Sequence, residues 1–156
     1  AGAYFLYFRA VHQGRDLVMT RLETEELILR PLQKNETELG GSCCLSASVF
    51  DYGGREGCFA VVSKESRKIV GTVLCPEEEL KVFIAENSRD LGFGADGLSL
   101  ALDALFGLMG REKVTAVCEK NNLPAVKMLL HCGMEQIKEE NTLLHWALTR
   151  EVWERI

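Results

Sequence analysis

The chain has 156 residues, of which 47% are hydrophobic and 26% charged, a composition typical of one soluble globular domain with its own core. A net charge of -5 without a Lys/Arg cluster argues against a nucleic-acid partner. No apolar run is long enough to cross a bilayer, which argues against a membrane protein.

Six cysteines stand at positions 43, 44, 58, 75, 118 and 132. They form no Cys-x-x-Cys pair, and none has a spacing to histidine that is typical of zinc. This usage is typical of reduced thiols in the cytoplasm. We therefore expect a cytoplasmic protein without a metal site.

Two interpretations fit residues 1–20. In the first, residues 1–20 are a leader foreign to the domain, because Met19 immediately precedes the patterned opening at 21–32. Alternatively, the aromatic and β-branched residues at 4–11 form an extra strand. In either case we expect a single domain over residues 21–156.

Short runs of β-branched and apolar residues predict strands, and two longer runs with helical spacing predict helices. Segment 33–57 shows neither period and is rich in glycine and serine. Hairpin-length turns between the early strands indicate antiparallel pairing. The expected strands are 26–31, 59–63, 69–74, 80–86, 113–119, 135–138 and 143–148, and the expected helices are 95–109 and 121–133, the second with an Asn cap and Pro124 in its first turn.

The run Arg89-Asp90-Leu91-Gly92-Phe93-Gly94 lies between the predicted strand 80–86 and the predicted helix 95–109. Its two glycines let the backbone turn tightly. The first turn of the helix then offers unpaired backbone N–H groups at the positive end of the helix dipole. This arrangement predicts an anion-binding site, most often for a phosphate or pyrophosphate.

Two common phosphate-binding motifs do not explain this run. A P-loop is excluded because no Gly-Lys-Ser/Thr follows. A dinucleotide-binding turn is matched by Gly92, Gly94 and Gly97, with Glu119 at the end of the next strand. We reject it because residues 87–91 separate the glycines from the strand, and too little chain remains for further parallel strands.

The third motif is an acyl-CoA site, whose signature is Arg/Gln-x-x-Gly-x-Gly/Ala before a long amphipathic helix. Arg89, Gly92 and Gly94 match it. Successive N–H groups from Leu91 to Ala95 could then hold a pyrophosphate, with Arg89 adding positive charge. The alternative is a plain strand-to-helix turn with glycines for close packing, and the motif alone does not decide between the two.

Several stretches from residue 21 onward are each similar to a short known motif. They are 24–32 (TEELILRPL), 69–73 (IVGTV), 79–85 (ELKVFIA), the Asn-x-x-Ala…Gly-Met set of Asn122, Ala125, Gly133 and Met134, and 147–153 (ALTREVW). In this order they resemble the GCN5-related N-acetyltransferase (GNAT) superfamily. The likeness is greatest to its branch of ribosomal-protein N-terminal acetyltransferases and their small-molecule relatives.

The resemblance implies an α+β (mixed α/β) fold, a mostly antiparallel central sheet with flanking helices and a splayed strand pair that binds the cofactor. Relatives carry two helices where this chain has segment 33–57, so we expect that pair to be shortened. The implied cofactor is acetyl-CoA, with its pantetheine arm on the backbone of Ile84 and its pyrophosphate at the glycine run. The expected cofactor-binding positions are Phe83, Ile84, Arg89, Asp90, Leu91, Gly92, Phe93, Gly94, Ala95, Asn122 and Lys127.

The resemblance also suggests which residues act in catalysis. Glu79 is the first candidate general base and Glu86 the second, although each is equally well a surface glutamate without a role. Leu129 stands where relatives often have a Tyr general acid, and Ala125 where the resembled branch has Ser. Loss of the acid slows the reaction rather than forbids it, because the pKa of a thiol leaving group is roughly 8 to 9.

We therefore expect an N-acetyltransferase that moves acetyl from acetyl-CoA to a primary amine, either a peptide N-terminus or a small-molecule amine, by direct attack. The rival hypothesis is a catalytically silent acyl-CoA-binding or regulatory module, motivated by Leu129, Ala125 and the short segment 33–57. A nicotinamide-binding fragment is a third, weaker alternative. The acceptor region, incomplete in one chain, is also consistent with a homodimer.

Overall fold

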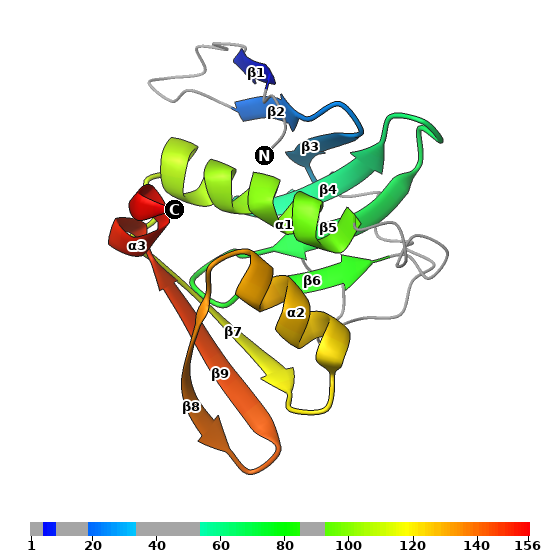
Figure 1. Cartoon of the computed structure of the whole chain (residues 1–156). Coiled ribbons are helices and arrows are strands. Elements are labelled where there is room, and N and C mark those ends of the chain that lie inside the picture. Colours follow the sequence, from blue (N-terminus) through cyan, green and yellow to red (C-terminus); the bar gives the residue numbers. More distant parts are fainter. Residues whose placement is uncertain (1–4, 9–18, 34–53, 85–92) are drawn as a thin grey trace.

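The computed structural model describes residues 5–8, 19–33, 54–84 and 93–156 (Figure 1). Within these ranges the chain forms nine strands and three α-helices, one of which continues as a π-helix. The strands are β1 (Phe5–Phe8), β2 (Met19–Glu23), β3 (Leu27–Pro31), β4 (Cys58–Ser63), β5 (Ile69–Leu74), β6 (Lys81–Ile84), β7 (Lys113–Glu119), β8 (Glu135–Glu140) and β9 (Leu143–Thr149). The helices are α1 (Phe93–Leu102), the π-helix Asp103–Leu108, α2 (Leu123–His131) and α3 (Arg150–Arg155).

The strands form two antiparallel sheets. The larger one follows the chain order β1-β2-β3-β4-β5-β6, and the smaller one has the order β7-β9-β8. In the larger sheet β5 and β6 are in register from Gly71 opposite Ile84 to Leu74 opposite Lys81. The mixed α+β architecture with a mostly antiparallel sheet is confirmed.

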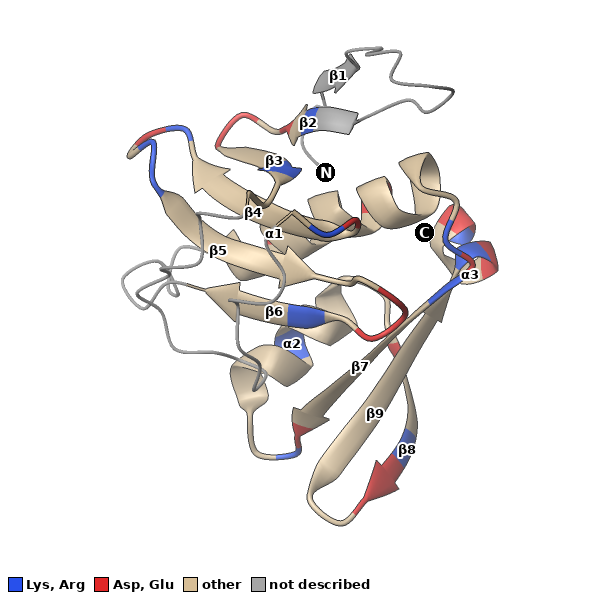
Figure 2. Ribbon diagram, turned by 180° about the vertical axis from the view of Figure 1, so that it is seen from behind, with Lys and Arg blue, Asp and Glu red and all other residues tan. Residues whose placement is uncertain are grey.

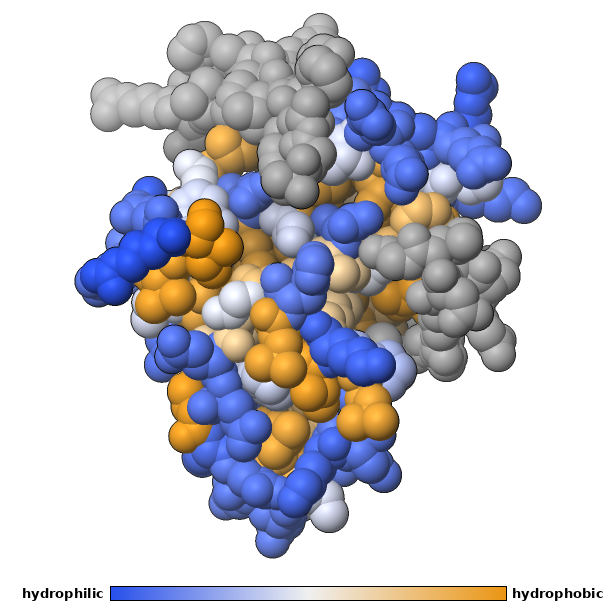
Figure 3. Space-filling model, viewed as in Figure 1, coloured by the Kyte–Doolittle hydropathy of each residue, from blue (hydrophilic) through white to orange (hydrophobic). Residues whose placement is uncertain are grey.

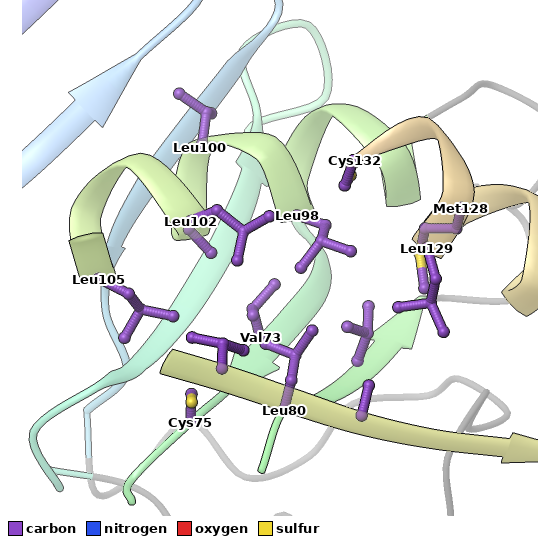
Figure 4. Packing of buried hydrophobic residues seen from close by; sticks show 14 of the residues in the cluster. Val73, Cys75, Leu80, Leu98, Leu100, Leu102, Leu105, Met128, Leu129 and Cys132 are labelled. Carbon is purple, nitrogen blue, oxygen red and sulfur yellow. The ribbon is translucent and has the colours of Figure 1, made fainter. Parts of the chain in front are cut away.

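Helices α1 and α2 lie on one face of the sheets and enclose the main core (Figure 1). Leu98 of α1, Leu105 of the π-helix and Leu129 of α2 point toward Val73 of β5 and toward Leu80, which directly precedes β6 (Figure 4). All five are buried. A second, smaller apolar cluster lies on the opposite face of the larger sheet. Its members are Leu32, Cys58, Ala60, Leu74 and Phe83.

Apolar side chains are also scattered over the helical face (Figure 3). The most exposed large ones in the described part of the chain are Leu123, Leu130, Ile137 and Ile156. Scattered apolar residues are normal on a protein surface, so they do not by themselves indicate a partner.

Most predicted elements agree with the structure. The strands at 69–74 and 113–119 have the predicted bounds, and β6 begins one residue later than predicted. The N-cap of α2 is confirmed, because Asn122 Oδ1 accepts a hydrogen bond from Ala125 N–H at 3.3 Å and Pro124 lies in the first turn. Residues 34–53, which include most of the expected shortened helical pair, lie outside the described residues.

Two helical features differ from the prediction. The predicted helix 95–109 begins at Phe93 and changes to a π-helix at Asp103, where Met109 N–H bonds to Ala104 O, five residues back. The C-terminal helix α3 was not predicted. Helix α3 packs on the π-helix through tertiary contacts, which have no local sequence signal.

The side chain of Trp153 contacts the π-helix from α3. Its ring stacks on Phe106 with centroids 5.5 Å apart, and its indole N–H donates to the Asp103 carboxylate. Arg150 Nη1 also donates to Phe106 O at 2.6 Å. Burial raises the pKa of Asp103, and the bond from Trp153 opposes that rise in part.

Replacing Asp103 by Asn should stabilise the protein at neutral pH. The folded-state pKa of Asp103 is raised, so the folded state binds this proton more tightly than the unfolded state. Its contribution to stability is therefore greatest at acid pH and falls as the pH rises through the folded-state pKa. Asn keeps an oxygen acceptor for Trp153 but has no charge to bury.

Urea unfolding at pH 7 and at a pH below about 4, where an unperturbed Asp takes up its proton, would measure this difference. We expect Asp103→Asn to exceed the wild type at pH 7 and to lose that advantage at acid pH. Glu135→Gln, on exposed β8, is the control with the same chemical change. An advantage of equal size at both pH values would contradict the electrostatic explanation.

Candidate active site at the gap between the two sheets

The two sheets are joined at one point. Glu79 and Thr115 form an isolated parallel bridge, in which Leu80 N–H donates to Thr115 O at 2.7 Å and Thr115 N–H donates to Glu78 O at 3.0 Å. Beyond this bridge, no further backbone hydrogen bond links β6 to β7 in the described part of the chain. The two strands diverge from there, which is the splayed pair that the fold prediction requires (Figure 1).

The register determines which backbone groups line the gap. Successive residues of a strand direct their N–H and C=O groups to opposite edges. Leu80 faces β7, so Val82 and Ile84 also direct their backbone groups toward the gap. Lys81 and Phe83 direct theirs toward β5, where they stand opposite Leu74 and Thr72.

Helix α1 begins beside the wide end of this gap. A Cβ atom added at Gly94 would lie 3.4 Å from Ile84 Cγ1 and 3.3 Å from Met128 Sδ, so the first turn of α1 packs directly on β6 and α2. Phe93, Gly94 and Ala95 occupy this turn, whose N–H groups have no partner within the helix. The site therefore combines a strand edge that no other described strand pairs with and a helix N-terminus.

Several predicted cofactor positions and one predicted base cannot be placed. Arg89, Asp90, Leu91, Gly92 and Glu86 lie outside the described residues. Their roles stay predictions.

Of the other predicted positions, two lie on α2 and one on β6. Asn122 caps α2, and Lys127 is exposed on the same helix. Phe83 is buried in the smaller cluster and turns its backbone to β5, so any contact it makes with a ligand has to come from its side chain.

Glu79 lies at the closed end of the gap. Bridged residues direct their side chains to the same face of a sheet, so Glu79 and Thr115 share the face opposite to α1 and α2. The Glu79 side chain is 49% exposed, and its Oε2 lies 3.6 Å from Nζ of Lys81. Figure 2 shows this face, with the acidic run 77–79 leading into β6 and the basic residue on the strand.

Sequence analysis did not single out two of these features. The backbone of Val82 faces the gap together with that of Ile84, which the two-residue period of the strand could have shown once the register was known. Lys81 lies on the same face as Glu79, as the two-residue period of a strand implies, and the structure adds that their charged groups are 3.6 Å apart.

The two positions where the family resemblance leads us to expect Ser and Tyr hold apolar residues that are closed to solvent. Ala125 and Leu129 are both buried in the main core beneath α2. A general acid therefore does not come from either position.

The described thiols are poor nucleophiles at neutral pH. Cys58, Cys75, Cys118 and Cys132 are free and buried. Burial raises the pKa of Cys75 and of Cys132 to about 11. Since the thiolate is the reactive form, an acyl-cysteine intermediate on these four residues is disfavoured.

The described residues contain neither a metal-binding cluster nor a membrane-spanning helix. No group of three or more His, Cys, Asp or Glu side chains is arranged to hold a metal ion within those ranges. None of the helices placed there has the length and apolar character needed to span a membrane.

Comparisons with known proteins agree with this fold. Residues 23–134 match the model of the acetyltransferase (GNAT) family. No curated protein is similar enough in sequence to be matched with the chain.

Several solved structures share the fold. A GNAT-family acetyltransferase from Bacillus anthracis has a TM-score of 0.66 at 14% identity, over 85% of this chain and 99% of that one. Ribosomal-protein-S5-alanine acetyltransferase from Vibrio fischeri has a TM-score of 0.67 at 14% identity, over 86% and 98% of the two chains. Spermidine N-acetyltransferase from Vibrio cholerae, in complex with CoA and spermine, has a TM-score of 0.55 at 18% identity, over 62% and 67%. At these identities the similarity is one of fold.

The close approach of β6 to β5 explains why the 69–73 motif has a glycine at position 71, and this explanation can be tested. A Cβ atom at Gly71 would lie 2.6 Å from Phe83 O and 2.9 Å from Ile84 Cδ1, so β6 pairs with β5 only because Gly71 has no side chain. Gly71→Ala should cost about 1–3 kcal/mol of unfolding free energy by overpacking. It should also displace the edge of β6 that faces the gap.

Chemical denaturation measures this loss, and Gly107→Ala is its matched control. A Cβ at Gly107 meets only Trp153 Cη2 at 3.4 Å and Cζ2 at 3.9 Å, which are ordinary contacts, so this variant should be near neutral. Equal stability of the two variants would show that the close approach at Gly71 is not required.

Proposed function

The chain belongs to the acetyltransferase (GNAT) family, and on that premise we propose that it is an N-acetyltransferase that uses acetyl-CoA. It transfers the acetyl group to a primary amine by direct attack. The observation that carries the proposal is the free edge of β6, at Val82 and Ile84, with the N-terminus of α1 packed against it.

The residues at the gap fit the chemistry of coenzyme A. Its pantetheine arm contains amide groups, which can bond to the N–H and C=O groups of Val82 and Ile84 as a neighbouring strand would. Its pyrophosphate is an anion, which suits the N–H groups of Phe93, Gly94 and Ala95. We include Arg89, Asp90, Leu91, Gly92, Asn122 and Lys127 in the proposed cofactor site on the resemblance of the motif.

In the proposed reaction, acetyl-CoA supplies an activated acetyl thioester. Glu79 takes a proton from the attacking ammonium group, since only a neutral amine is nucleophilic. A backbone N–H at the edge of β6 stabilises the developing oxyanion. Glu86 is the second candidate base. The absence of an acid at Ala125 and Leu129 is tolerated because the thiolate leaves without a proton.

The proposed acceptor is a cationic amine, either a small molecule or a peptide N-terminus. The acidic run 77–79 lies next to the closed end of the gap and favours positive charge there. The Vibrio structures of similar fold are named for spermidine and for a ribosomal-protein alanine, so both acceptor classes belong in the test panel. The proposal includes a cytoplasmic location and a homodimer that completes the acceptor side.

The burial of Ala125 and Leu129 favours one other function. A protein without a general acid could bind acyl-CoA and not turn it over, acting as a regulatory module. Isothermal titration with acetyl-CoA tests what the two functions share, since absence of binding contradicts both. Release of free CoA in the presence of the amine panel then separates them, because only the enzyme produces it.

Glu79→Gln should lower kcat for the best amine by about 10²–10⁴-fold, the usual contribution of a general base. Binding of acetyl-CoA, measured by titration, should stay as in the wild type. Glu77→Gln is the control, because it removes a neighbouring exposed carboxylate that is not at the bridge. If the two variants are equally active, the base lies elsewhere and Glu86 is the next residue to change.

A further inference from the structure

Lys81 has a primary amine on the strand that forms the proposed cofactor edge. Its backbone pairs with Leu74 of β5, so its position on the sheet is fixed. Its side chain stands on the same face as Glu79, and the two charged groups are 3.6 Å apart. Along β6, Lys81 lies between the closed end of the gap and Ile84, immediately before Val82 in the chain.

We propose that the chain acetylates itself on Nζ of Lys81. The inference rests on the proposed function, because the acetyl donor is acetyl-CoA at the edge of β6. It goes further in naming a modification site within the chain, a lysine amine, that would react before any external acceptor binds.

The geometry that supports this step is the proximity of three groups. The edge at Val82 and Ile84 would hold the thioester arm, and Glu79 is the proposed base. Lys81 directly precedes Val82 of this edge in the chain, and its side chain is ion-paired with Glu79. A nucleophile fixed on the strand that would bind the acetyl donor reacts with that donor in an effectively unimolecular step, which raises its effective concentration greatly.

The ion pair does not prevent the reaction. Glu79 is 49% exposed and Lys81 26% exposed, and ion pairs of this kind contribute little to stability. The flexible four-carbon stem lets Nζ leave Glu79 and turn toward the gap.

The chemistry balances without a further reagent. Glu79 removes one proton from the Lys81 ammonium group, and the nitrogen lone pair then forms a bond to the thioester carbonyl carbon. The C–S bond breaks, and its electron pair leaves with the sulfur as the CoA thiolate. A second proton passes from the new amide nitrogen to solvent. The products are Nζ-acetyl-lysine and CoA, and the positive charge at Lys81 is lost.

Selectivity distinguishes this reaction from chemical acetylation by a thioester, which follows exposure. Lys138 is 58% exposed and Lys120 is 65% exposed, both far more than Lys81. A purely chemical reaction would modify these two first. A reaction at the gap would modify Lys81 first.

The test incubates the purified full chain with acetyl-CoA alone, followed by intact mass measurement and peptide mapping. We expect one dominant acetyl group on Lys81, with a rate constant independent of protein concentration. Lys81→Arg keeps the charge and should remove this product, whereas the control Lys138→Arg should not. Glu79→Gln should slow the modification at least tenfold.

Two results would overturn the inference: modification of Lys120 and Lys138 ahead of Lys81, or a rate that rises in proportion to protein concentration. The titration with acetyl-CoA and the amine panel, run on the same sample, separate this failure from that of the proposed function. Binding and turnover with an unmodified Lys81 reject self-acetylation alone. Absence of acetyl-CoA binding rejects both.

Discussion

The bridge between Glu79 and Thr115 is the contact on which the site depends. Two backbone hydrogen bonds hold the larger and smaller sheets together at this point. Further pairing would turn β6 into an ordinary central strand with both edges used. Because the described pairing ends at the bridge, Val82 and Ile84 keep one edge for a ligand, although unpaired edges are normally covered or paired in proteins.

The two faces of the sheets carry different kinds of residue. The face beneath α1 and α2 carries the main core, which holds the N-terminus of α1 against Ile84. The opposite face carries Glu79 and Lys81, which are charged and partly exposed. Side chains of a strand alternate between its two faces. The segment that contains β6 therefore contributes alternate residues to the main core and places the residues between them, among them Lys81, on the opposite face.

Much of the secondary structure could be predicted from local pattern. Segments 69–74 and 113–119 are strands with the predicted bounds, and Asn122 with Pro124 correctly marks the start of α2. Helix α3 and the π-helix could not be predicted in this way. Trp153 stacks on Phe106, and Arg150 bonds to Phe106 O, so each element is stabilised by a residue more than forty positions away in the chain.

By itself, the sequence determined most of the strands, the start of α2, the antiparallel pairing of the early strands and the resemblance to a family, because periodicity, caps and turns act over a few neighbouring residues. It also indicated Glu79 as a candidate base and Ile84 as a candidate cofactor-binding position. Only the tertiary structure decided which backbone groups face the gap and which face of the sheet carries both Glu79 and Lys81. A one-residue change of register would exchange these faces, and the register follows from the pairing of distant strands and from the close approach at Gly71.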